Sequence, residues 1–143
     1  MSSDRITVDE FKYMSVFSEI TGATPVRCVI DNENSRLLFL VGKGELGKAV
    51  GRGGRNIKIL SDLFRKPVEV YEFSEDLHEM IKNLFVGVNI LEINVTVRNE
   101  EKIVSIKVKE EDKGKAIGKN GRNVRRANII LGKLFGVSRV IIR

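Results

Sequence analysis

The sequence has 143 residues and a mass of 16.1 kDa, which allows one ordinary domain or two small ones and excludes a barrel enzyme or a full doubly wound nucleotide-binding fold. Hydrophobic residues make up 42% and charged residues 31% of the chain, so it can bury a core and does not have the composition of a disordered protein. Lys and Arg number 25 against 19 Asp and Glu, and this net charge of +6 favours a polyanionic partner.

The first half of the chain predicts a helix, two strands, a short helix, a longer helix and a third strand. Thr7 and Glu10 form a capping box, and apolar residues then recur at helical spacing. Two strand-like runs follow at 26–30 and 37–41, separated by a turn-rich segment. A glycine-rich block and an amphipathic helix come next, and a strand at 68–73 ends the unit. The apolar residues of the first helix are Tyr13, Val16, Phe17 and Ile20.

The second half of the chain predicts the same order of elements. Ser74 is expected to cap its first helix. Apolar and polar residues alternate over 91–97, as in a half-buried strand, and a turn near 99–101 leads to a second strand at 104–108. A second glycine-rich block, an amphipathic helix and a strand at 137–142 complete the chain.

An internal repeat supports this division. Residues 47–58 are GKAVGRGGRNIK and residues 114–125 are GKAIGKNGRNVR, at a constant offset of 67. Seven of these twelve positions are identical and most of the others are chemically equivalent, which chance does not explain. We therefore predict two α+β domains, 1–73 and 74–143, each with a three-stranded mixed sheet and three helices packed on one face.

Each glycine block is suited to holding a phosphate backbone. The glycines of 51–54 and 118–121 leave no Cβ in the way of a nucleic-acid strand, and the helix that follows directs its N–H groups and positive dipole end toward it. Residues 43–58 contain five basic residues and one acidic residue, and residues 113–126 contain six basic residues and no acidic residue. A single Gly-x-x-Gly is usually a plain turn, but its duplication with cations in and after both loops favours nucleic-acid binding.

At these residues the chain resembles a known family. Val50-Gly-x-x-Gly and Ile117-Gly-x-x-Gly resemble the KH-domain signature, and the order of elements is similar to the type II KH arrangement. Two such domains filling the chain resemble the archaeal NusA-like family of transcription termination factors. The resemblance implies binding of single-stranded RNA in transcription termination or antitermination, with each loop clamping the backbone of about four nucleotides.

The resemblance also implies a set of RNA-binding residues. The loops would hold RNA backbone, the aliphatic residues beside them would form the floor of a base groove, and the cations would contact phosphates or bases. Gly53 is expected to make the first loop more flexible than the second, at a cost in affinity. The implied residues are Lys48, Val50, Gly51, Arg52, Gly53, Gly54, Arg55, Ile57, Lys58, Lys115, Ile117, Gly118, Lys119, Asn120, Gly121, Arg122, Val124, Arg125 and Arg126.

The expected partners are single-stranded RNA and, by the same resemblance, RNA polymerase or other transcription factors. The polymerase-binding and OB-fold domains that precede the KH pair in bacterial NusA do not fit in this length, so polymerase contact would use the KH surface or another protein. No window approaches the roughly 18 apolar residues of a membrane helix, and the start Met1-Ser-Ser-Asp-Arg does not resemble a signal peptide. We expect a cytoplasmic monomer without a cofactor. The alternative to a role in transcription is a ribosomal-RNA-binding or ribosome-assembly role.

A different class of protein, a small nucleotide hydrolase, is suggested by Gly42–Lys48. This segment matches all but the end of a P-loop, but Ala49 stands where the motif needs Ser or Thr for magnesium. We expect Cys28 to be a buried structural thiol and His78 a solvated surface residue, and these two cannot form a zinc site between them. With no triad, carboxylate pair or metal cluster in the sequence, we expect no enzyme.

Overall fold

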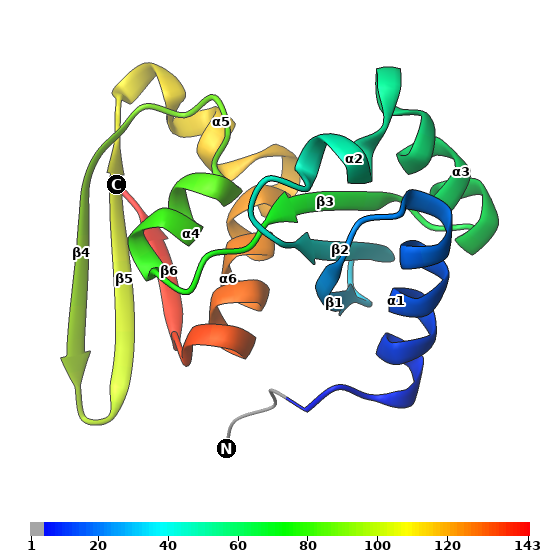
Figure 1. Ribbon diagram of the computed structural model, residues 1–143. Coiled ribbons are helices and arrows are strands. Elements are labelled where there is room, and N and C mark those ends of the chain that lie inside the picture. The colour runs from blue at the N-terminus through cyan, green and yellow to red at the C-terminus, as the bar shows by residue number, and fades with distance from the viewer. Residues whose placement is uncertain (1–4) are drawn as a thin grey trace. The chain divides into compact units, whose positions relative to one another are not determined.

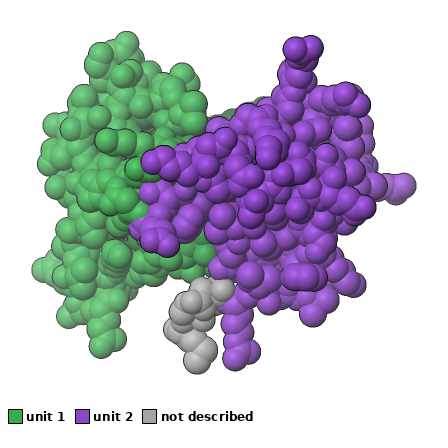
Figure 2. Space-filling model, in the orientation of Figure 1, with its two compact units in different colours: residues 1–4, 76–143 green, residues 5–75 purple. Residues whose placement is uncertain are grey.

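The computed structural model describes residues 5–143, which form two compact units, 5–75 and 76–143 (Figures 1 and 2). Each unit is α+β and contains a three-stranded mixed sheet with three α-helices, which confirms the predicted fold class. Residues 1–4, where the predicted first domain and the signal-peptide argument begin, lie outside the described residues.

The first unit follows the predicted order. Its sheet has the order β1-β2-β3, with β2 antiparallel to β1 and parallel to β3. The parallel pairing is possible because two helices separate β2 from β3 in the sequence. The elements are α1 (Val8–Thr21), β1 (Pro25–Asp31), β2 (Arg36–Val41), α2 (Leu46–Val50), the 3₁₀ turn η1 (Arg52–Gly54), α3 (Arg55–Phe64) and β3 (Val68–Glu72).

The second unit repeats this topology with β4, β5 and β6 in the places of β1, β2 and β3. It adds a 3₁₀ turn, η2, before the short helix. The elements are α4 (Leu77–Leu84), β4 (Ile90–Arg98), β5 (Glu101–Val108), η2 (Glu110–Asp112), α5 (Lys113–Ile117), η3 (Lys119–Gly121), α6 (Arg122–Phe135) and β6 (Arg139–Ile142).

The start of α1 is capped as predicted, but only by one half of the capping box. The Thr7 hydroxyl oxygen accepts a hydrogen bond from the Glu10 N–H at 3.1 Å. The Glu10 carboxylate is buried and accepts from Arg27 Nε at 2.6 Å and from the Cys28 N–H at 3.0 Å. The capping-box pattern predicts that Glu10 lies on the helix surface. In the structure it is buried, because it pairs with Arg27 of β1.

The core of the first unit lies between its helices and its sheet. Phe17 of α1 stacks on Phe39 of β2 with ring centroids 4.2 Å apart, and both side chains are fully buried. Ile57 and Phe64 of α3 pack against this cluster. Ile20, which the helical spacing assigned to the same face, is 38% exposed, because the buried face at this end of α1 passes through Phe17 and Thr21.

The first helix of the second unit starts two residues later than predicted. Asp76, not Ser74, is its N-cap, and the Asp76 carboxylate accepts from the Glu79 N–H at 2.9 Å. The resulting α4 has only 8 residues, whereas α1 has 14.

The prediction of a half-buried β4 holds only in part. Ile93 is half-buried, but Val97 is 70% exposed. Leu91 lies at a register shift between Ile90 and Glu92, so it leaves the predicted alternation, and it is 57% exposed. In the first unit the long helix α1 packs against β1, whereas in the second the shorter α4 packs against α6 and the β4–β5 hairpin extends away from the helices (Figure 1). Alternation predicts which side chains share a face, but not whether another element covers that face.

Candidate nucleic-acid interface

The two glycine blocks form two loops with the same backbone path. The first glycine of each loop has angles that only glycine adopts readily: φ 79° and ψ 165° at Gly51, and φ 80° and ψ 167° at Gly118. The last glycine of each is left-handed, with φ 77° at Gly54 and φ 72° at Gly121. The repeat seen in the sequence is therefore also a repeat of three-dimensional structure.

The third residue of each loop is left-handed whether or not it is glycine. Gly53 has φ 63° and ψ 22°, and Asn120 has φ 56° and ψ 27°. Asparagine is one of the few other residues that adopt this conformation routinely. Gly53 and Asn120 are exposed, and no atom lies within 4 Å of where a Cβ of Gly53 or Gly54 would stand. The outer surface of the first loop is thus bare main chain.

Part of the loop's hydrogen-bonding capacity is used within the loop itself. The Gly54 N–H donates to the Gly51 carbonyl at 3.1 Å, and the Gly121 N–H donates to the Gly118 carbonyl at 3.0 Å. Each loop is thereby closed into a 3₁₀ turn before the next helix begins. The turn stiffens the corner and makes these two N–H groups unavailable to an incoming phosphate.

Exposed cations surround both loops. In the first unit Arg52, Arg55 and Lys58 are exposed. In the second unit Lys119 and Arg122 are exposed, and Arg125 is half-buried. These are six of the predicted contact residues, and in each unit they lie within the loop and the first turns of the helix that follows.

The predicted lysines of the two short helices have acceptors within the protein. Lys48 Nζ lies 4.0 Å from a carboxylate oxygen of Glu45, and the Lys48 side chain is 59% exposed. Lys115 Nζ donates to the Gly87 carbonyl at 3.0 Å. Both amines can still reach solvent, but the amine of Lys115 already has a protein acceptor.

The predicted aliphatic residues are half-buried. Val50 and Ile57 in the first unit, and Ile117 and Val124 in the second, belong to this class. Ile57 packs against the core cluster of its unit. A side chain that is partly exposed and partly in the core can stabilise the fold and still present one edge to a base.

Arg126 differs from the other predicted contact residues. It is only 9% exposed, and its guanidinium donates to the Leu84 carbonyl at 2.9 Å and to Asn123 Oδ1 at 3.2 Å. Arg126 therefore links α6 to the C-terminal end of α4, and its side chain lies largely inside the unit, unlike the other predicted cations.

Two asparagines at the base of the loops were not assigned a role from the sequence. Asn56 Nδ2 donates to the Lys48 carbonyl at 3.1 Å, and Asn123 Nδ2 donates to the Lys115 carbonyl at 2.9 Å. Both bonds join the start of the longer helix to the preceding short helix, across the loop. Their identity at the repeat offset of 67 was the available signal.

A second pair of repeated contacts fixes the start of each short helix. Glu45 accepts from the Thr24 N–H at 3.0 Å, and Asp112 accepts from the Asn89 N–H at 2.8 Å. In both units the acidic side chain ties the segment before the first strand to the short helix. The hydrogen bonds from the Asn89 main chain and side-chain amide hold the pKa of Asp112 below its usual value.

The P-loop-like segment does not form a phosphate cradle. The Gly44 N–H donates to the Glu72 carboxylate at 3.1 Å, and the Glu45 carboxylate accepts from the Thr24 N–H. Where a nucleotide phosphate would need converging N–H groups, the chain supplies its own carboxylate, which would repel a phosphate.

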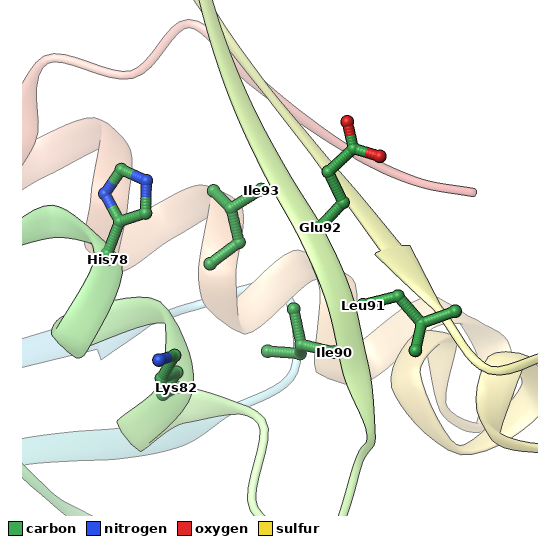
Figure 3. Close-up of a pocket in the computed structure, with 6 residues that line it drawn as sticks. All are labelled: His78, Lys82, Ile90, Leu91, Glu92 and Ile93. Carbon is green, nitrogen blue, oxygen red and sulfur yellow. The ribbon is translucent and has the colours of Figure 1, made fainter.

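The remaining candidate residues show no catalytic arrangement. Cys28 is fully buried, as predicted. His78 is exposed and lines an open pocket of about 210 Å³ between α4 and β4, where His78 and Ile93 face one another (Figure 3). None of the predicted RNA-binding residues lines this pocket. Within residues 5–143 no group of three or more His, Cys, Asp or Glu could hold a metal ion, and none of the helices there could span a bilayer.

Comparisons with known proteins place both loops in matched regions. A family model described as the KH domain matches residues 12–95, and one described as the NusA-like second KH domain matches residues 77–141. Each match contains one of the two glycine loops. The matches are therefore consistent with a tandem pair.

Three similar proteins cover most of the chain. Probable transcription termination protein NusA of Methanococcus vannielii is 32% identical over 136 residues, which is 95% of this chain and 78% of that protein. The protein of the same name from Thermoplasma acidophilum is 28% identical over 145 residues, covering 100% of this chain and 99% of that protein. The crystal structure of APE1850 is 57% identical and superposes with a TM-score of 0.93, covering 96% of this chain and all of that one.

Proposed function

The chain belongs to the archaeal NusA-like family of KH-domain proteins, and on that basis we propose that it binds single-stranded RNA through two KH domains, 1–73 and 74–143, as a factor in transcription termination or antitermination. The observation that carries the proposal is the pair of exposed glycine loops with the same backbone angles, each surrounded by cations.

The loops would hold the sugar–phosphate backbone by close approach. The bare main chain at Gly53–Gly54 leaves room for a ribose or phosphate to touch the protein backbone. Arg52 and Lys119 project from the same position of the two loops and neutralise phosphate charge there. Because this attraction is electrostatic, affinity should fall steeply as salt concentration rises.

The bases would lie against the half-buried aliphatic residues beside the loop. Val50 and Ile57 in the first domain and Ile117 and Val124 in the second offer apolar edges to the face of a base. Recognition of this kind needs unpaired bases that can leave a stack, so it selects single-stranded over double-stranded RNA.

We further propose that the protein acts as a cytoplasmic monomer that binds RNA without catalysing a reaction, and that RNA polymerase is its protein partner. The relatives from Methanococcus vannielii and Thermoplasma acidophilum, each named probable transcription termination protein NusA, support the link to transcription. Recovery of ribosomal particles instead of polymerase in a pull-down with the intact chain would favour the ribosomal alternative.

The decisive experiment replaces the central residues of each loop. Arg52→Asp with Gly53→Asp, and Lys119→Asp with Asn120→Asp, should each weaken binding of a short single-stranded RNA by more than about tenfold, measured by fluorescence anisotropy. Aspartate tolerates the left-handed backbone at residues 53 and 120, so the fold should persist.

A matched control keeps the charge change and moves it away from the loops. Lys107→Asp with Asn99→Asp alters an exposed lysine of β5 and an exposed asparagine that is also left-handed, with φ 51°. This variant should retain nearly all of the parent's affinity. Equal loss in the control and the loop variants would mean that net charge, not the loops, determines binding.

A further inference from the structure

We propose that Asn56 and Asn123 are positioning residues that set each glycine loop in its RNA-receiving conformation before RNA arrives. This inference rests on the proposed RNA-binding function and adds to it the device that shapes the loops. It starts from a contact that the structure contains twice, once in each unit.

Each asparagine satisfies a main-chain carbonyl at the end of a short helix. A helix leaves its last carbonyls without partners in the helix. At the end of α2 the Gly47 carbonyl is capped by the Gly51 N–H at 2.9 Å, and the next carbonyl, that of Lys48, accepts from the Asn56 side chain. The asparagine side chain therefore donates to the first carbonyl that receives no main-chain hydrogen bond from the end of the helix.

The second unit has the same succession of bonds. The Gly118 N–H caps the Gly114 carbonyl at 2.8 Å, and the Asn123 side chain takes the Lys115 carbonyl. In both units this one side-chain bond spans eight residues and closes the loop at its base.

Each asparagine also fills the space beside the first glycine of its loop. A Cβ added to Gly51 would lie 2.9 Å from Asn56 Cγ, and one added to Gly118 would lie 2.7 Å from Asn123 Cγ. Each amide therefore lies directly against the glycine Cα. The first glycine is required both by its backbone angles and by the asparagine that packs against it.

The chemistry required at this position is that of asparagine. The bond to the short helix needs a donor, so aspartate, which has the same shape, would place a carboxylate against a carbonyl oxygen. It would also add negative charge beneath a phosphate site. Alanine would leave the carbonyl without this donor and open space beneath the glycine.

The consequence is that each loop is held in place before it binds. A strand that meets a preorganised loop does not have to order it, which improves affinity without adding a contact to RNA. Loss of one such hydrogen bond should weaken binding by about five- to tenfold for each loop.

The test measures RNA affinity and stability on the same intact variants. Asn56→Ala and Asn123→Ala should each weaken anisotropy-detected binding of a short single-stranded RNA by about five- to tenfold at a temperature where the variants are folded. The slope of affinity against salt should stay at the parent's value, because no phosphate contact is removed. Lys119→Ala, in contrast, should reduce that slope.

Asn128→Ala is the matched structural control. It lies on the same helix, its amide donates to the Val124 carbonyl at 3.0 Å, and its oxygen accepts from the Val140 N–H at 2.9 Å. This variant should lose thermal stability and keep the parent's RNA affinity. If Asn128→Ala and Asn123→Ala both lose affinity in proportion to their loss of stability, the role of Asn123 is merely structural and the inference is wrong.

Asn123→Asp keeps the proposal testable if the alanine variants do not fold. It preserves side-chain volume, and it should weaken binding at least as strongly as Asn123→Ala. In the RNA-free protein, the NMR signals of residues 118–121 should shift and broaden in both variants. Unchanged signals together with unchanged affinity would overturn the inference.

The outcomes separate this inference from the proposed function. If the parent protein itself does not bind single-stranded RNA, the proposed function fails and the inference falls with it. If the parent binds and the loop-reversal variants do not, but the asparagine variants bind like the parent, only the inference fails.

Discussion

The first glycine loop, Gly51–Gly54, and the second, Gly118–Gly121, follow the same backbone path but are held by different neighbours. In the second unit Asn123 also accepts a hydrogen bond from Arg126, which is anchored to the Leu84 carbonyl. The repeat places Ile59, 37% exposed, at the position equivalent to Arg126. The two loops thus have the same geometry, but only the second is supported by an internal brace, Arg126.

The difference extends to the charges around the loops. Up to residue 74 the chain has 11 basic and 10 acidic residues, and after it 14 basic and 9 acidic residues. The second unit therefore has both the stiffer support and the larger positive charge. We expect it to contribute more of the RNA affinity, so the reversal of Lys119 and Asn120 should cost more affinity than that of Arg52 and Gly53. The following variants test the difference in support between the two loops.

The largest effect is expected from Gly118→Ala. The glycine-only backbone angles cost about 1–3 kcal/mol for any other residue, and the new Cβ would displace Asn123. Urea unfolding should show a loss of about 2–3 kcal/mol. Gly114→Ala, in a helix with open space at its Cβ position, should leave stability unchanged or raise it; equal losses in both variants would show that the loop geometry is not special.

Arg126→Met tests the internal brace. Methionine keeps much of the side-chain volume but removes the bonds to Leu84 and Asn123, so the free energy of unfolding should fall by about 2 kcal/mol. Truncating the equivalent Ile59 to alanine should cost less than about 1 kcal/mol, because that side chain is partly exposed. Comparable losses in urea unfolding would mean that the two loops are supported alike.

Gly53→Asn transfers a feature of the second loop to the first. Asn120 already adopts the same left-handed angles, so asparagine fits at residue 53 without strain and lowers the entropy of the unfolded chain. We expect a gain of about 0.5 kcal/mol in unfolding free energy and a modest rise in RNA affinity. A loss of affinity would show that the bare main chain or the flexibility of the first loop is useful for binding.

Lowering the pH is expected to have the smallest effect on the free energy of unfolding. Burial raises the pKa of Asp31, but hydrogen bonds from Arg36 and Asn34 outweigh burial and lower it, and the bonds from Asn89 lower the pKa of Asp112. Both groups are more acidic folded than unfolded, so their contribution is present above the unfolded pKa and is lost as the pH falls through the folded value. Urea unfolding followed from pH 7 to below about pH 4 should show this loss.

Asn variants assign the acid effect to one unit or the other. Asp31→Asn should flatten the pH dependence of the first unit and Asp112→Asn that of the second, each with lower stability at neutral pH. An unchanged pH profile in both variants would mean that other carboxylates cause the acid sensitivity.

Local sequence patterns were enough to predict much of the secondary structure and of the candidate site. The order of elements in both units, the two loops and most of the cations beside them follow from periodicity, turn residues and the repeat at an offset of 67. These features depend on residues near one another in the chain, so the sequence alone could determine them.

Tertiary structure decided the features that depend on distant partners. Only packing shows that Glu10 pairs with Arg27, that Arg126 turns inward to Leu84, and that most residues of β4 remain exposed. The supporting role of Asn56 and Asn123 belongs to the same class, although their repetition was visible. Whether a side chain becomes buried and what it bonds to depend on which elements meet in space, and no local pattern encodes that.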